Sequence, residues 1–142
     1  MMINGSQRLF IFCVRGSRFA LDIQDVAEVL DPPVSFPVPW APGYLKGTIN
    51  FHGSLVTLHD LADFMNVGPI GHGGNILVLD KRIANLALWV DSVENIVSFD
   101  AVLEEDESSD PVVDKVLTMP DGEIRMLAVG KLLERIEEDL IK

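Results

Sequence analysis

The chain has 142 residues, of which 48% are hydrophobic, and this is enough for one globular domain that folds without disulfides or a structural metal. Its 22 acidic and 11 basic residues give a net charge of −11, which repels phosphates and argues against nucleic acid as a partner. Residues 1–8 lack the apolar stretch of a signal peptide, and no window approaches the roughly 20 apolar residues of a membrane span, so we expect a cytoplasmic protein without direct membrane insertion.

A β-hairpin is predicted near the amino terminus. Residues 9–14 are apolar throughout, as in a strand covered on both faces, and Cys13 in this run is expected to be a buried, unreactive thiol. Gly16-Ser17 suits a two-residue turn. Residues 19–23 then alternate between larger apolar and smaller or polar side chains, which predicts a return strand with one face in water.

After this hairpin the period changes. Val26, Val29 and Leu30 stand at helical spacing, which predicts a short helix or a tight turn. Five prolines between residues 32 and 42 fix backbone angles and remove amide donors, so we expect an ordered but irregular crossover there.

The middle of the chain predicts a second hairpin and a third. Residues 47–50 and 54–58 are strand-like, with a tight turn at 51–53, and Asp60 is placed to cap a short helix that ends near Met65. A glycine-rich connection at 68–74 follows, without the lysine that a phosphate-binding loop would need. The next hairpin joins residues 76–79 to 83–90 through a turn at 80–82.

The carboxyl-terminal part has three features. Seven acidic or serine residues at 104–110 predict a solvated loop. Residues 120–123 turn the last hairpin. Residues 130–142 place apolar side chains at helical spacing between charges, which predicts an amphipathic helix docked on the rest of the fold.

Two parts of the chain resemble each other. Apolar positions match at a constant offset of 67 residues, pairing Phe19, Leu21, Ile23, Val26, Val29 and Leu30 with Leu86, Leu88, Val90, Val93, Ile96 and Val97. Residues 53–55 also match 122–124 at an offset of 69. We therefore predict one domain over residues 1–142, built from two similar β subdomains at about 9–68 and 75–136, each burying its apolar face against the other because neither has much core of its own.

The order of these motifs resembles the CheW-like family of chemotaxis coupling proteins. The resemblance rests on five pieces of sequence, in this order along the chain: the leading apolar strand at residues 9–14, Phe19–Ile23 with Val26–Val29, Gly47–Gly53 before Leu58–Leu61, Val90–Ile96, and Leu132-Leu133. It covers roughly residues 9–136. Each piece alone is weak, but their order and spacing make the match fairly specific.

The resemblance implies a mainly β fold of two SH3-like five-stranded β-barrel subdomains packed together, with short helices and a carboxyl-terminal amphipathic helix. It also implies a non-enzymatic adaptor or scaffold in a bacterial two-component system, without catalytic residues, cofactor or metal. Such a protein couples the cytoplasmic tip of a chemoreceptor to a CheA-type histidine kinase by binding the kinase's CheW-like regulatory domain. The partner-binding residues that it implies are Val26, Glu28, Gly47, Asn50 and His52.

Three departures from the family pattern point to a diverged member. His52 stands where most members have arginine, which exchanges a permanent forked cation for a ring that is mostly neutral at pH 7. Lys115 stands near a common glycine, and Ala128-Val129 replaces a usual Leu-Asp, so we expect the last hairpin to be shaped differently. Partners from a chemosensory system that does not control motility would fit these changes.

Two other functions remain open from the residues alone. A small hydrolase could use His52 or His59 with Asp60, although no nucleophile elbow or paired-histidine helix motif accompanies them. A structural or ligand-sensing β-module is the other alternative. The hydrolase would need a deep polar pocket in which these side chains converge.

Overall fold

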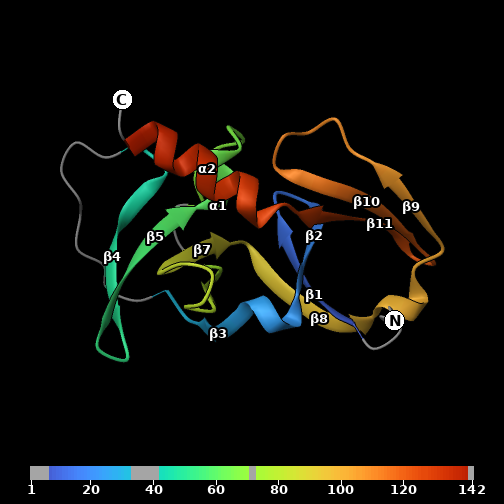
Figure 1. Cartoon of the computed structure of the whole chain (residues 1–142), viewed down its shortest axis with the longest axis horizontal. Coiled ribbons are helices and arrows are strands. Elements are labelled where there is room, and N and C mark those ends of the chain that lie inside the picture. Colours follow the sequence, from blue (N-terminus) through green and yellow to red (C-terminus); the bar gives the residue numbers. More distant parts are fainter. Residues whose placement is uncertain (1–6, 33–41, 71–72, 141–142) are drawn as a thin grey trace. The chain divides into compact units, whose positions relative to one another are not determined.

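The computed structural model describes residues 7–32, 42–70 and 73–140, and these form a mainly β protein with two sheets (Figure 1). The strands are β1 (Arg8–Val14), β2 (Ser17–Asp22), β3 (Val26–Leu30), β4 (Leu45–Phe51), β5 (Ser54–Asp60), β6 (Asn75–Leu79), β7 (Leu86–Val90), β8 (Ser92–Ser98), β9 (Glu104–Glu107), β10 (Val113–Met119) and β11 (Gly122–Leu127). The helices are α1 (Leu61–Phe64) and α2 (Val129–Leu140), with short 3-10 turns at Ile23–Asp25 and Phe99–Ala101. Among the described residues, no helix has the length and apolar character needed to cross a membrane.

The chain divides into two compact units. The terminal unit comprises Met1–Phe12, Gly16–Ile23 and Glu94–Lys142, and the central unit comprises Cys13–Arg15 and Gln24–Val93. The six-stranded sheet has the order β8-β1-β2-β11-β10-β9, and the five-stranded sheet has the order β3-β6-β7-β5-β4. The expected mainly β fold of two small sheets is therefore confirmed, with β9 as a sixth strand on one of them.

The two sheets have the same topology. Each sheet contains strands from both sequence repeats, and equivalent strands occupy equivalent places in the two sheets. Strands β1, β2, β3, β4 and β5 correspond to β6, β7, β8, β10 and β11 at offsets of 67 or 68 residues. The predicted offset of 69 for residues 53–55 is one residue too large, because Ser54 and Gly122 occupy the same place after their turns. Each sheet combines the first hairpin of one repeat with the third strand and second hairpin of the other. The joining pair is parallel in both sheets, β2 with β11 and β5 with β7. The predicted halves at 9–68 and 75–136 thus follow the repeat, whereas the compact units cut across it.

The cores repeat as well. In the terminal unit the buried cluster includes Leu9, Ile11, Ala20, Leu117 and Ile124. In the central unit the corresponding positions are Ile76, Val78, Ala87, Ile49 and Val56, which form its own buried cluster. These side chains alternate along their strands, so each sheet presents one apolar face to its core.

Several predicted elements are confirmed. The hairpins β4–β5 and β10–β11 form where the turn residues predicted them. The hairpin β6–β7 also forms, but its turn is longer than the predicted 80–82, because β7 begins at Leu86 and not at residue 83. Asp60 caps α1, accepting a hydrogen bond from the Asp63 backbone N–H. Helix α2 is amphipathic and buries Leu132 and Ile136. Most of the proline-rich crossover lies outside the described residues.

Two segments were predicted wrongly, and both are edge strands. Residues 26–30 form β3 and not a helix, because their backbone pairs with β6 across a bulge between Val26 and Glu28. Residues 104–107, expected in a solvated loop, pair with β10 as β9 although every side chain is exposed. In both cases the apolar pattern gives no strand signal, because most of these side chains point into water.

Four details of the first and last hairpins also differ from expectation. The first turn is Arg15-Gly16, one residue earlier than predicted, and both have positive φ (49° and 82°), as a type I′ turn requires. Ala20 is fully buried, so β2 is covered on both faces, while Cys13 is only partly buried. The last hairpin keeps the shape of its counterpart, because its bulge before Lys115 matches the bulge before Gly47.

Candidate functional site

The β4–β5 turn presents two of the five expected site residues to solvent. His52 (φ 50°) and Gly53 (φ 84°) both adopt the left-handed conformation of a type I′ turn, which favours glycine and costs a histidine some strain. The Asn50 side-chain oxygen accepts the Gly53 backbone N–H at 3.0 Å and so holds the turn. The His52 side chain is 76% exposed and packs edge-on to Phe51, with ring centroids 4.3 Å apart.

Glu28 lies opposite this turn. His52 Nε2 is 3.8 Å from Glu28 Oε1, and this contact is an ion pair whenever the imidazole is protonated. Glu28 belongs to β3 and the turn follows β4, and these strands are the two edges of the central sheet. The sheet therefore curls until its edges meet, which explains how residues 24 positions apart share one surface.

The remaining two expected site residues are less accessible. Val26 is partly buried in β3, where it pairs with Leu79. Gly47 is buried in β4 at the bulge opposite Leu58, with φ 153°. Gly47 therefore shapes the strand, and it offers no side chain to a partner. The structure brings together Glu28, Asn50 and His52 as the exposed part of the expected set.

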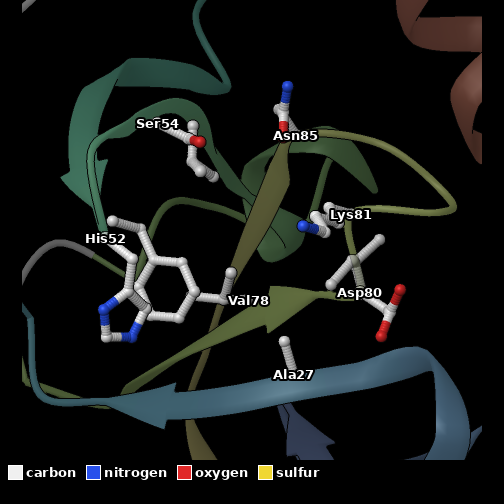
Figure 2. A pocket seen from close by; sticks show the side chains of 10 residues that line it. Ala27, His52, Ser54, Val78, Asp80, Lys81 and Asn85 are labelled. Carbon is white, nitrogen blue, oxygen red and sulfur yellow. The ribbon is translucent and has the colours of Figure 1, made fainter.

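A pocket of about 300 Å³ opens in the central unit beside this group (Figure 2). Its apolar lining consists of Ala27, Phe51, Val56, Val78 and Leu79. Its polar lining consists of His52, Ser54, Asp80, Lys81 and Asn85. Apart from His52, no lining residue was predicted as a site residue. These residues come from β3, the β4–β5 hairpin, β6 and the turn after β6, and they meet only after the sheet has curled. No local motif in the sequence could have identified them.

The charges beside the pocket are unevenly paired. Arg82 contacts Asp25 at 3.0 Å and Asp80 at 3.4 Å, and its backbone N–H also donates to Asp80 Oδ1 at 2.9 Å. Lys81 has no ion pair with any residue of the described chain. Figure 2 shows its ammonium group turned toward the pocket and the Asp80 carboxylate turned away. Lys81 is therefore a cation at the pocket rim whose neighbouring carboxylate is already engaged.

The residues of the hydrolase alternative do not converge. His59 and Asp60 are neighbours in β5, so their side chains point to opposite faces, and both are buried. Asp60 accepts the backbone N–H groups of Asp63 at 3.0 Å and Ile70 at 2.7 Å, which commits its carboxylate to structure. His52 lies at the other end of the hairpin, roughly 20 Å from His59 at about 3.3 Å per residue. This geometry contradicts the proposed hydrolytic site.

His59 itself is unusual for its burial. Only 2% of the residue is exposed, and neither ring nitrogen has a hydrogen-bond partner among the residues that the structure describes. Burial lowers the pKa of His59 from 6.5 to about 4, and this outweighs the opposing effect of a Thr57 backbone group. The ring is therefore neutral at pH 7 and enclosed near Tyr44, with ring centroids 5.8 Å apart.

Comparison with known proteins gives relatives for most of the chain. One is "Probable chemotaxis protein CheW" of Rhizobium etli, which is 27% identical over 97 residues that cover 67% of this chain and 63% of that protein. Another is "Chemotaxis protein CheW" of Rhizobium meliloti, 27% identical over 101 residues that cover 68% of this chain and 64% of that protein. The matched region thus spans slightly less than two thirds of the length of these relatives.

A solved structure has the same fold. It is the scaffolding protein TtCheW from Thermoanaerobacter tengcongensis, with a TM-score of 0.76 and 21% sequence identity over 85% of this chain and 88% of that one. The domain family described as "CheW-like domain" matches residues 8–137, which is nearly the whole chain. This chain therefore belongs to the CheW-like domain family.

Proposed function

We propose that this protein is a cytoplasmic, non-enzymatic adaptor that couples chemoreceptors to a CheA-type histidine kinase through protein–protein contacts. One surface binds the CheW-like regulatory domain of the kinase, and another binds the cytoplasmic tip of the receptor. Membership of the family supports this function, as does the name of the scaffolding protein that shares the fold.

The observation that carries the proposal is where the polar side chains of the central unit lie. Glu28, Asn50 and His52 are exposed, and His52 lines an open pocket, whereas His59 and Asp60 are both buried and the Asp60 carboxylate is engaged by backbone amides. An exposed polar group beside an apolar recess is the arrangement of a recognition surface, with a central anchor site and a polar rim.

Binding to separately purified partners tests this function. We would measure affinities by calorimetry for the kinase's CheW-like domain and for a receptor tip fragment, using the wild-type chain and the variants Val26→Asp, Glu28→Lys and His52→Glu. At least one partner should bind the wild type, and the charge changes should weaken that binding about tenfold, since like charges at an interface cost more than one lost rim contact.

The charge-swapped double variant, Glu28→Lys with His52→Glu, is the matched control because it restores opposite charges across the 3.8 Å contact. Its folding, followed by circular dichroism, should equal that of the wild type. Lack of binding to either partner by the wild type would contradict the adaptor function. Unchanged affinity in all three single variants would remove Val26, Glu28 and His52 from the interface.

A further inference from the structure

The pocket of the central unit is large enough to hold one inserted side chain, and we refer to it as the socket. Its volume of about 300 Å³ is at the lower limit of the roughly 300–1,000 Å³ found for small-molecule sites, and it is open to solvent at its rim. Val56, Val78 and Leu79 are almost fully buried and form its apolar base. An inserted aliphatic or aromatic side chain would cover this base and lose little polar hydration in doing so.

The rim of this pocket has a charge preference. Lys81 is exposed and unpaired among the described residues, and Figure 2 shows its ammonium group facing the recess. The nearby Arg82 is already held by Asp25 and Asp80. In a chain with a net charge of −11, Lys81 is therefore a local positive group beside an apolar recess. A carboxylate next to an inserted apolar side chain would complement both features.

We propose that this pocket seats one apolar side chain of a protein partner, and that a carboxylate adjacent to that side chain pairs with Lys81. The proposal rests on the adaptor function in that the central unit must meet a protein partner. It adds the chemistry of the partner segment, an apolar anchor beside Asp or Glu, and it assigns Lys81 and Ala27 to the interface.

Two variants separate the anchor from the charge. Ala27 is exposed on the edge strand β3, and Figure 2 shows its methyl group pointing into the pocket, so Ala27→Phe should fill the recess without disturbing the core. Lys81→Glu reverses the rim charge. Matched controls are Val67→Phe, at an exposed position outside the pocket, and Lys131→Glu, at an exposed position on α2.

The experiment measures the affinity of the kinase's CheW-like domain and of the receptor tip fragment for each variant. For whichever partner binds the wild type, Ala27→Phe and Lys81→Glu should each weaken binding about tenfold, whereas each control should stay within about twofold. Replacing single acidic residues of that partner by lysine should also identify one change that restores binding to Lys81→Glu.

The outcomes distinguish the two proposals. If the wild type binds a partner and both pocket variants bind it equally well, the socket is overturned while the adaptor function stands. If neither partner binds the wild type, the adaptor function fails and the socket fails with it. If Ala27→Phe weakens binding but no acidic residue of the partner rescues Lys81→Glu, the apolar anchor is supported and the carboxylate is overturned.

Discussion

The buried His59 should make the stability of this protein depend on pH in a way that one substitution removes. The pKa of the ring is about 4 in the folded protein and 6.5 as a free side chain. Between these values the unfolded chain binds a proton that the folded chain does not, so the free energy of unfolding rises with pH across this window. The contribution is fully present above pH 6.5 and is lost as the pH falls toward 4.

The size of the effect follows from the shift. The difference of 6.5 − 4 = 2.5 pH units corresponds to about 3 kcal/mol, at 1.36 kcal/mol for each unit. Two variants isolate it. His59→Leu removes both the titration and the two ring nitrogens, which have no partner among the described residues. It should stabilise the protein at pH 7 by about 1–3 kcal/mol, because buried polar groups without partners are costly. His59→Gln removes titration but keeps a polar group buried.

Urea unfolding at several pH values between 4 and 7.5 tests this reasoning. Because the many carboxylates contribute their own pH dependence, the quantity to compare is the difference between the wild type and each variant at the same pH. That difference should change by about 3 kcal/mol across the window for both variants, and only His59→Leu should gain stability at pH 7. A difference that stays constant with pH would mean that the folded protein accommodates a protonated His59.

Three further predictions concern the fold. His52→Asn should stabilise the protein by up to about 1 kcal/mol in chemical unfolding, because Asn-Gly is the preferred pair for a type I′ turn; a loss of stability would contradict the strain assigned to His52. Asp60→Ala should cost about 2–4 kcal/mol, since it leaves the Asp63 and Ile70 amides without an acceptor, and an unchanged melting temperature would refute that role. Fragments separated near residue 70 should be unfolded alone by circular dichroism and should fold when mixed, because each sheet takes strands from both; independent folding of either fragment would refute the strand exchange.

Turn residues and the alternation of apolar and polar side chains predicted most of the hairpins. The edge strands β3 and β9 were not predicted. The β4–β5 and β10–β11 hairpins follow from glycine, asparagine and proline at fixed positions, which act locally. Residues 26–30 were predicted as a short helix or a tight turn because their apolar positions have helical spacing, and in the structure a bulge accommodates this spacing in a strand. Burial could not identify β9, since its side chains are exposed and it is joined to β10 by backbone pairing and by the Lys115–Glu105 ion pair.

The candidate site was predictable only in part. The positions of Glu28 and His52 at one surface follow from the family resemblance, because nothing in their spacing shows that two sheet edges will meet. The pocket and Lys81 were missed entirely, since a turn lysine is ordinarily a solvated residue. Gly47 was assigned to the binding surface but is buried. Its role is structural, because β4 forms a bulge at this residue.

The internal repeat separates what folding requires from what recognition requires. The core positions of the two units keep their apolar character, and the exposure along β3 is repeated in Val93–Val97 of β8. The pocket rim is not repeated: Val14 stands at the position that matches Lys81, and Pro120 at the position that matches His52. Because both sheets fold without a common rim, the fold does not demand Lys81 or His52, and their presence in one unit alone is what a partner-binding role for that unit predicts.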